Sequence, residues 1–591
     1  MLALEKGGNM NLKIKSCCTA FGVALSLIMG CQEKMADGVT IERKSDAVLS
    51  PSTRPHPTAA LLKRINKDYD IYGIVHFSIN TYTDREWGFG NEKPEWFNPS
   101  EFDADQIVKA CKDGGLQGLV VVAKHHDGFC LWPTKTTEHN ITKSPFREGK
   151  GDYLREMERA CRKYGLKLGV YVSPWDRNNK VYASEEYKKI FWKQVLEIFS
   201  GDYGELNELW FDGANGGDGY YGGACESRKI PKNYYDFSGL IKEVQKYQKD
   251  FCTFYDWDEG ELHYPANEAG MLDPDARMTF PARADKPTPG WENCLNKGDI
   301  NGSLFKQAEC DFPLRPGWFY HESENGFTKS PQYLMKIYLS SIGNGGTMNI
   351  GIAPDQRGLV TDEDINALKG FANIKSRFFE KEVKSTKEPF NMVVMREDVS
   401  KGEHIDGWTL SLDGKEIQKG ISIGGKRIRV FDKPLTGEKL TFTITAGSAK
   451  PSDVKIKLYY VDEELLKSVM SAKPPPRPKY DPNAKGLELK KTEKEIVYQF
   501  NFPRFFTSVM ITPDTTKLGG TPVTFKLDYS DDGVKWIEDE NEYRLGNVAA
   551  NPIPQTIKLA APQKAKYVRI KSMRSLKEKD PIAVLSFQLV K

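Results

Sequence analysis

Between Tyr72 and Phe378 the sequence alternates short apolar runs, rich in β-branched residues, with longer segments in which apolar residues recur every three or four positions. The short runs have the length and composition of buried strands, and the longer segments have the period of amphipathic helices. This alternation is typical of βα units arranged around a parallel sheet. It predicts an α/β fold with a (β/α)8-like barrel, which we assign to residues 56–378.

The clearest elements of that barrel can be placed directly on the sequence. The expected strands are residues 73–79, 118–123, 166–172, 208–211, 251–255 and 347–352. The expected helices have apolar residues on one face among charged ones, and they are residues 104–111, 153–164, 184–199 and 234–247.

The sequence changes character after the barrel, where short alternating segments are separated by Gly, Asp and Lys turns, as at residues 408–412, 421–423 and 440–444. This pattern predicts a β-sandwich over residues 379–472. The proline-rich run from Lys473 to Lys479 favours a stiff spacer, so residues 473–495 are expected to be a linker. Strands return at 523–529 and 567–571, and residues 496–591 resemble the discoidin-like β-sandwich of many carbohydrate-binding modules. The predicted fold is therefore a barrel followed by C-terminal β-sandwich domains.

The first thirty-one residues resemble an export signal. Lys13 and Lys15 precede an apolar run that ends in Gly30-Cys31, and the run is too short to be a convincing membrane span. The small residue before Cys31 resembles a lipobox, after which the cysteine would become the lipidated N-terminus. We expect residues 1–31 to be a signal peptide, residues 32–55 a linker, and the protein a lipoprotein of the periplasm, outer membrane or cell surface. An ordinary cleaved signal with a chance cysteine is the alternative.

Charge and cysteine usage exclude several kinds of partner and cofactor. Lys and Arg number 84 against 81 Asp and Glu, so the formal charge of +3 provides no basic stripe for nucleic acid. Membrane contact is expected only through the lipid anchor. Beyond Cys31 the cysteines are odd in number, none forms a CxxC pair, and no histidine completes a zinc spacing. We therefore expect neither a disulfide framework nor a structural metal.

Polar side chains follow the expected barrel strands at their carboxyl ends, where the substrate-binding loops of such barrels begin. Asp212 follows the apolar run Leu209-Trp210-Phe211 and precedes Gly213, a position that suits a carboxylate nucleophile. An ordinary Asp-Gly turn is the alternative interpretation. The other strand ends carry His76, the run Lys124-His125-His126-Asp127-Gly128, and Tyr171 with Trp175 and Asp176.

Several sequence blocks, in order along the barrel, together resemble glycoside hydrolase family 29, the α-L-fucosidases. They are His76, Asp84-Arg-Glu-Trp87-Gly, Lys124-His-His-Asp-Gly-Phe-Cys-Leu-Trp-Pro, Tyr171-Val-Ser-Pro-Trp175, Glu208-Leu-Trp-Phe-Asp-Gly213 and Arg315-Pro-Gly-Trp-Phe-Tyr-His321. The block at Asp84 and the Cys-Leu-Trp-Pro continuation are most similar to the branch that acts on α-1,3/4-linked fucose.

The resemblance implies a retaining, exo-acting enzyme without a cofactor, whose partner is a fucosylated oligosaccharide or glycoconjugate. It implies Asp212 as the nucleophile and Trp318 against the apolar methyl side of the sugar. Aromatic faces suit the C6 methyl group, and imidazole and carboxylate groups bind ring hydroxyls directionally. Glu309 and Asp311 are expected to be structural neighbours of the site. The residues implied around fucose are His76, Glu86, Trp87, His125, His126 and Tyr171.

A retaining glycosidase also needs an acid/base carboxyl, at roughly 5 to 5.5 Å from the nucleophile. The family's Gly-Asn-Glu pattern has its nearest counterpart in Ala266-Asn267-Glu268, which makes Glu268 the expected acid/base. The stretch 256–306 departs from the family pattern, and Glu259, Glu261 and Glu292 are rivals.

Two other functions stay open on the sequence. The altered acid/base stretch and the attached β-domain are compatible with a lipid-anchored glycan-binding protein whose barrel has lost activity. A barrel glycosidase for another sugar, such as α-galactose, would keep the carboxylates but not the apolar methyl pocket.

Overall fold

The computed structural model describes residues 35–48, 54–83, 85–231, 233–255, 260–282, 293–476, 485–546, 548–549 and 552–590. The expected signal peptide with Cys31 lies outside the described residues, as do Asp84, Glu259 and Glu292. Residues from Ala36 onward form one compact unit.

Within the described residues, parallel strands close into a barrel in the order β12-β13-β2-β3-β4-β5-β8-β9. This confirms the predicted (β/α)8-like fold class. The first and last parts of the barrel sequence meet directly, because Met348 in β13 pairs with Ile71 in β2. The strands are β2 (Ile71–Val75), β3 (Gly118–Lys124), β4 (Lys167–Val172), β5 (Glu208–Trp210), β8 (Cys252–Phe254), β9 (Leu262–His263), β12 (Gln307–Pro313) and β13 (Thr347–Ile352).

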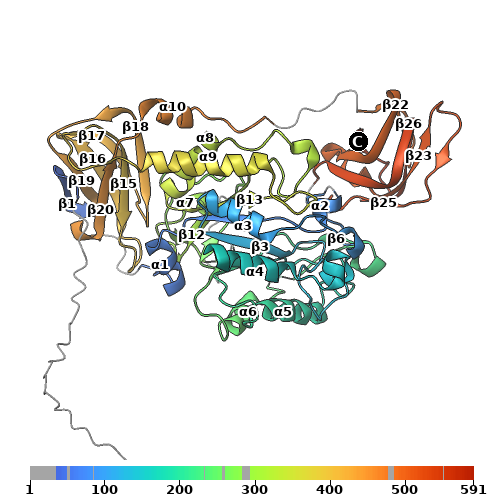
Figure 1. Ribbon diagram of the computed structural model, residues 1–591, viewed down its shortest axis with the longest axis horizontal. Coiled ribbons are helices and arrows are strands. Elements are labelled where there is room, and N and C mark those ends of the chain that lie inside the picture. The colour runs from blue at the N-terminus through green and yellow to red at the C-terminus, as the bar shows by residue number, and fades with distance from the viewer. Residues whose placement is uncertain are drawn as a thin grey trace, which may run out of the picture. The chain divides into compact units, whose positions relative to one another are not determined.

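The principal barrel helices begin at residues whose side chains satisfy backbone N–H groups of the first turn. Asp103, Asp152, Ser184, Ser330 and Thr361 are such caps, and each accepts a hydrogen bond that the helix itself cannot supply. Figure 1 shows α8 and α9 running side by side, and these two helices are in contact. The helices are α1 (Ala59–Asn66), α3 (Ala104–Asp113), α4 (Tyr153–Tyr164), α5 (Glu185–Phe199), α6 (Phe237–Val244), α8 (Pro331–Ser341) and α9 (Asp362–Phe378).

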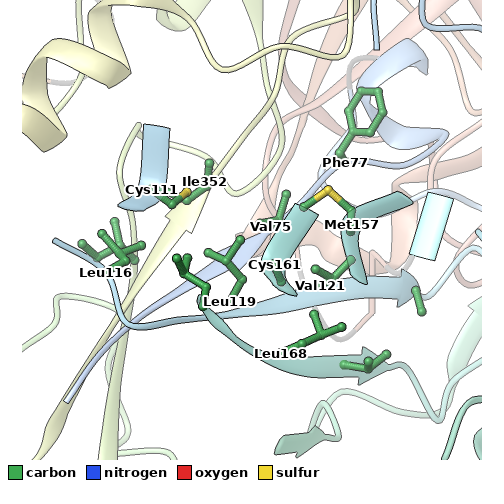
Figure 2. Packing of buried hydrophobic residues seen from close by; sticks show 14 of the residues in the cluster. Val75, Phe77, Cys111, Leu116, Leu119, Val121, Met157, Cys161, Leu168 and Ile352 are labelled. Atoms are coloured by element: carbon green, nitrogen blue, oxygen red, sulfur yellow. The ribbon is translucent and has the colours of Figure 1, made fainter. Parts of the chain in front are cut away.

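The main hydrophobic core lies between the barrel strands and these helices. Figure 2 shows Val75, Val121 and Leu168 on the strands facing side chains such as Cys111 of α3 and Met157 of α4. All of these side chains are buried. Burial of this apolar surface is the main stabilising contribution that holds the helices against the sheet.

The β2 strand is shorter than predicted. It ends at Val75 rather than at residue 79, so that His76 already begins the loop after the strand. The His76 backbone N–H still donates to Ile352 O at 2.9 Å, which keeps this first loop residue close to the strand end. The shortening therefore brings His76 to the end of the barrel where the loops gather.

Shorter elements occupy the connections of the barrel domain. They are α2 (Asn80–Thr83), α7 (Asn293–Lys297), β6 (Gly217–Gly219), β7 (Glu226–Arg228), β10 (Thr279–Phe280) and β11 (Leu304–Phe305). β6 pairs with β7, and β10 pairs with β11, both antiparallel.

After the barrel, two four-stranded sheets enclose a second core that contains Trp408 and Phe442. Their orders are β1-β19-β16-β17 and β14-β20-β15-β18. The elements are β1 (Val39–Val48), β14 (Glu382–Val383), β15 (Phe390–Glu397), β16 (Ile405–Leu412), β17 (Lys415–Gly420), β18 (Arg427–Leu435), β19 (Leu440–Gly447), β20 (Val454–Tyr459) and α10 (Glu463–Met470).

Two predictions for this region are wrong. Residues 32–55 were expected to be a linker, but they contain β1, which pairs in parallel with β19 some 400 residues later along the chain. Residues 421–423 were expected to be a strand, but they form part of a turn between β17 and β18. The Trp408 indole N–H donates to Ser422 O there, so the buried apolar residue Ile423 belongs to a loop that covers the core.

The C-terminal region forms an antiparallel sheet in the order β21-β22-β26-β23-β24, with β25 on β23 and β27 on β22. Its strands are β21 (Leu487–Lys491), β22 (Glu495–Pro513), β23 (Pro522–Ser530), β24 (Ile537–Glu538), β25 (Tyr543–Arg544), β26 (Gln555–Ser575) and β27 (Val584–Val590). The predicted linker 473–495 therefore contains the strand β21, and that part of the prediction is wrong. All five side chains of β21 are exposed, so the segment lacks the apolar face that would have marked it as a strand.

In the described part of the chain, no helix has both the length and the apolar character needed to cross a membrane. The same residues contain no cluster of three or more potential metal ligands.

Candidate active site

A pocket of about 380 Å³ opens among the loops that follow the barrel strands. Most of the residues expected around the site from the sequence line this pocket, although they come from distant parts of the chain. The expected residues on its wall are His76, Trp87, His125, Tyr171, Asp212, Glu268 and Trp318. Glu86 and His126 lie behind this wall and hold it in place, as described below.

Asp212 follows β5 and has both carboxylate oxygens fixed by hydrogen bonds. The Tyr171 hydroxyl donates to Oδ2 at 3.1 Å, and the Ala214 backbone N–H donates to Oδ1 at 2.6 Å. The side chain is still 26% exposed, toward the pocket that it lines. Asp212 is therefore an oriented carboxylate that remains accessible to a bound molecule.

Three histidines form a buried cluster, and one of them lies beside this carboxylate. His126 Nε2 lies 3.8 Å from Asp212 Oδ2, and its Nδ1 lies 2.7 Å from Ser173 Oγ. Burial lowers the pKa of His76 to about 4, although the charge of Glu86 opposes the shift. Burial also lowers the pKa of both His125 and His126 well below the usual range. The three rings are consequently neutral near pH 7, and each can donate one hydrogen bond and accept another.

Glu86 organises the loop that carries Trp318. Its Oε2 accepts from the Trp318 backbone N–H at 2.9 Å, and its Oε1 accepts from Phe319 N–H at 3.1 Å and lies 2.7 Å from His321 Nε2. Burial acts to raise the pKa of Glu86, but the bond to His321 and the two backbone donors outweigh it, and the net shift is downward. Glu86 is therefore an ionised carboxylate beside the pocket.

Glu268 stands at the mouth of the pocket, on the loop after β9. Its Oε2 accepts from the Trp318 indole N–H at 3.3 Å, and the side chain is accessible to solvent. Partial burial raises the pKa of Glu268, the hydrogen bond from Trp318 opposes the shift, and the charge of Glu86 adds to it. A carboxyl with a raised pKa in contact with a pocket has the properties of a general acid.

The loop that presents Glu268 contains a backbone feature at the position where the sequence departs from its family pattern. Ala266 has φ 63°, in the left-handed region that glycine adopts without strain. Asn267 fixes this turn, because its side chain donates to Met271 O at 2.9 Å and accepts from Ala269 N–H at 3.1 Å. The Ala-Asn-Glu segment thus keeps a glycine-type turn with alanine in it.

Glu261, one of the three rivals of Glu268, lies away from the pocket. It precedes β9, and its backbone carbonyl accepts from the N–H of Gln307, the first residue of β12. Its Oε2 accepts from Thr253 N–H at 2.8 Å. Glu261 therefore belongs to the beginning of the parallel strands, whereas the pocket lies beyond their carboxyl ends.

The floor of the pocket includes residues to which the sequence analysis gave no role in binding. Trp210 stacks on Tyr171 and Phe254, with ring centroids 5.0 and 4.0 Å apart. Asp311 of β12 was expected to be a structural neighbour, and it lines the pocket itself. Burial, with the charges of Glu309 and other carboxylates nearby, raises the pKa of Asp311 well above its usual range. Alternation along β5 and β12, which turns every second side chain into the barrel, is the signal that could have identified them.

Beneath this floor an ion network fills the inside of the barrel. Arg64 of α1 bonds Glu208 Oε2 at 2.5 Å and Glu309 Oε2 at 2.9 Å. The other oxygen of Glu309 accepts from the Trp210 indole at 3.0 Å and from Asn349 at 2.9 Å. Trp210 is thereby held in one orientation under Asp212 and Tyr171 by buried, hydrogen-bonded charges.

The pocket thus combines an oriented carboxylate, a carboxyl with a raised pKa, neutral imidazoles and several aromatic faces. A small ligand rich in hydroxyl groups, with one apolar side, has partners for each of its surfaces here. An oriented carboxylate and a second carboxyl with a raised pKa are the pair that acid/base chemistry on such a ligand requires.

Two known protein families match this chain. The model of a family described as "Alpha-L-fucosidase" matches residues 62–374, and that of the "F5/8 type C domain" matches residues 483–583. The second match agrees with the expected discoidin-like character of the C-terminal sheet.

Two curated plant proteins and one solved structure are similar to the chain. Alpha-L-fucosidase 1 of Arabidopsis thaliana is 34% identical over 309 residues, which cover 52% of this chain and 58% of that protein. Putative alpha-L-fucosidase 1 of Oryza sativa subsp. japonica is 33% identical over 364 residues, covering 60% and 65% respectively. The chain thus spans less than two thirds of either plant protein. The crystal structure of a glycoside hydrolase 29 family member from an unknown rumen bacterium is 31% identical, with a TM-score of 0.65, and the match covers 91% of this chain and 100% of that one.

Proposed function

The chain belongs to the α-L-fucosidase family, and from that premise we propose that it is a retaining, exo-acting α-L-fucosidase that releases terminal L-fucose from fucosylated glycans. The observation that carries the proposal is the pairing in one pocket of Asp212, with both oxygens oriented, and Glu268, with a raised pKa. An oriented carboxylate suits a nucleophile, and a carboxyl with a raised pKa suits a general acid.

In the first step of the proposed mechanism, a carboxylate oxygen of Asp212 attacks the anomeric carbon of fucose. A bond forms between Asp212 and that carbon, and the glycosidic C–O bond breaks. Glu268 gives its proton to the departing oxygen, so that the rest of the glycan leaves as a neutral alcohol. The hydrogen bonds from Tyr171 and Ala214 keep Asp212 in the attacking orientation.

In the second step, the ionised Glu268 takes a proton from a water molecule that attacks the same carbon. The bond to Asp212 breaks, the carboxylate is restored, and Glu268 regains its proton. Two displacements on opposite faces leave fucose in its original α configuration. No cofactor takes part in either step.

The remaining polar and aromatic groups are proposed to bind the fucosyl ring. Neutral His76 and His125 serve as donors and acceptors for ring hydroxyls. His126 and ionised Glu86, which do not line the pocket, position Asp212 and Trp318 for the same ring. Trp87 and Trp318 supply aromatic faces, and Trp318 is assigned to the C6 methyl side.

Linkage and location are part of the proposal. The Asp84-Arg-Glu-Trp87 block supports a preference for α-1,3/4-linked fucose, and the sequence around Cys31 supports an exported, lipid-anchored protein.

The test of the activity is hydrolysis of a 4-nitrophenyl α-L-fucoside, compared with the α-L-galactoside, which differs from it only by a hydroxyl group on C6. We expect turnover of the fucoside and little of the galactoside, and magnetic resonance should detect α-L-fucose as the first product. If the galactoside is hydrolysed faster than the fucoside, the enzyme is a galactosidase rather than a fucosidase. If no fucoside is hydrolysed, the protein is better explained as a glycan-binding protein. Oligosaccharides with α-1,2, α-1,3, α-1,4 and α-1,6 linkages then test the linkage preference.

A further inference from the structure

A second pocket, of about 200 Å³, lies next to the first and is lined by residues from two parts of the chain. Arg85, Glu86, Trp87 and Glu324 come from loops of the barrel, and Met510 and Ile553 come from the C-terminal sheet and the segment before β26. Trp87 lines both pockets, so that one indole separates the second pocket from the one that contains Asp212.

Arg544 and Gly546 of the C-terminal domain, beside this pocket, contact the barrel loops around Trp87. The Arg544 guanidinium lies over the Phe89 ring, 5.6 Å from its centroid. Gly546 packs so closely on the Arg177 guanidinium that a Cβ atom there would collide with it. Arg177 in turn donates to Gly88 O at 2.5 Å. The C-terminal domain therefore packs against Phe89 and Arg177, which adjoin the loop that carries Trp87.

Gly546 and Gln555 are joined by two hydrogen bonds. Gln555 accepts from Gly546 N–H at 2.9 Å and donates to Gly546 O at 2.6 Å. This pair closes the base of the segment from which Ile553 projects toward the pocket lining. Gly546 is thus tied to Gln555, the first residue of β26.

The chemistry of the second pocket suits a sugar ring. Arg85 lines the pocket with a guanidinium that is held by Glu92, 3.1 Å from Nη1 to Oε1, and its buried Nε has no hydrogen-bond partner among the described residues. Burial raises the pKa of Glu324, whose carboxyl is a further polar group of the lining. Met510, Ile553 and Pro554 add apolar surface to the same lining. A ring with hydroxyls on its edge and C–H groups on its face has partners of both kinds here.

We propose that this second pocket binds a sugar residue of the glycan other than the fucose that is cleaved, so that the C-terminal domain forms part of the substrate site. The inference rests on the proposed fucosidase function. A terminal fucose occupies the first pocket alone, and the rest of the glycan must extend beyond it. The second pocket shares Trp87 with that site, and its wall is built by both domains.

The test compares two substrates that share fucose but differ in what is attached to it. α-L-Fucosyl fluoride has no second sugar, whereas the best substrate of the linkage panel does. Ile553 is 40% exposed, so Ile553→Trp should fill the second pocket without disturbing a core. We expect kcat/KM for the oligosaccharide to fall by about 10-fold or more, the usual scale for losing one set of pocket contacts, and kcat/KM for the fluoride to stay within about twofold.

Met510→Ala removes apolar surface instead of filling the pocket. It should lower kcat/KM for the oligosaccharide by a smaller factor than Ile553→Trp and leave kcat/KM for the fluoride nearly unchanged. Ile537→Trp is the matched control, because Ile537 is an exposed isoleucine of the same domain that does not line the pocket. An unchanged oligosaccharide rate in Ile553→Trp would overturn the inference. Equal losses on both substrates in the two variants would also overturn it, because the domain would then only support the fucose site. If the unaltered protein hydrolyses neither substrate, the proposed function itself fails.

Discussion

At the scale of single residues, the Glu268 carboxyl has a pKa raised by partial burial and a position open to solvent at the pocket mouth. Both properties suit a group that gives a proton to one leaving group and then takes one from water. For Glu268→Ala we expect hydrolysis of a glycan to fall by about 10²- to 10⁴-fold, the usual contribution of positioned proton transfer. An aryl fucoside with an acidic phenol should lose much less in the first step.

The Glu268→Ala variant should also accumulate the fucosyl-enzyme, because the second step loses its base. Stopped-flow detection should record a burst of phenol followed by slow turnover, and azide should accelerate the slow phase. Equal slowing of both substrates without a burst would assign the role to another carboxyl, with Glu259 and Glu292 next in order. Glu261→Ala is the control, since Glu261 lies at the opposite ends of the strands.

The buried histidines should make stability depend on pH. Burial holds the pKa of His76 at about 4, whereas its ordinary value is about 6.5. Between about pH 6.5 and pH 4, His76 is therefore protonated in the unfolded chain but neutral in the folded protein. The free energy of unfolding should fall as pH decreases through this window, by up to about 3 kcal/mol for His76 alone. Denaturant titrations of His76→Asn should show a shallower fall, and an identical slope in both proteins would contradict the assignment.

At the scale of elements, the loop after β9 carries a strained turn at Ala266. Ala266 in the left-handed region destabilises the folded protein by about 1–2 kcal/mol, a cost that glycine does not have. Glycine also increases the conformational entropy of the unfolded chain, which lowers the free energy of unfolding by about 0.4–1 kcal/mol. Ala266→Gly should therefore raise the free energy of unfolding by about 0.5 to 1 kcal/mol. Ala269→Gly, in the same loop but without positive φ, should lower it. If calorimetry shows that both substitutions change the free energy of unfolding in the same direction, Ala266 does not adopt the left-handed conformation.

The elements that the sequence predicted well are those whose stability is visible in local patterns. The barrel helices have capped first turns and apolar faces, and the residues 153–164 predicted as a helix are those of α4. Strands β1 and β21 were not predicted, because their residues are largely polar and their pairing partners are supplied by other parts of the sheet. Strand β12 was also missed, since Glu309 and Asp311 interrupt its apolar character.

The same limit applies to the candidate site. His76, His125 and Asp212 could be predicted because each follows an apolar strand at the end where barrel sites form, and Tyr171 because it lies at that end of β4. The role of Glu309 depends on Arg64, a residue of α1 that is far away in the sequence and meets it only inside the closed barrel. Asp311 in turn has its pKa raised by burial and by the charge of Glu309. No local pattern encodes such a contact.

At the scale of the whole molecule, the N-terminal sequence is proposed to attach the enzyme to a membrane. If Cys31 is lipidated, the mature protein should sediment with membranes, and Cys31→Ser should give an uncleaved or soluble form. One acyl chain binds only marginally, so stable sedimentation requires the several chains that a bacterial lipoprotein carries. Identical fractionation of both forms would argue for simple secretion. The serine variant should keep its activity on an aryl fucoside, because Cys31 lies outside the catalytic barrel.

The function proposed for the whole chain depends on Asp212 as the nucleophile. Asp212→Gly should abolish hydrolysis while the barrel stays folded, since water cannot replace a carboxylate that bonds covalently to the sugar. Azide can enter the vacated space and attack the anomeric carbon from the side that Asp212 occupied. The most direct measurement is therefore the configuration of the product when azide restores turnover of an α-L-fucosyl substrate by this variant. The account predicts β-L-fucosyl azide, and formation of the α-azide would contradict it.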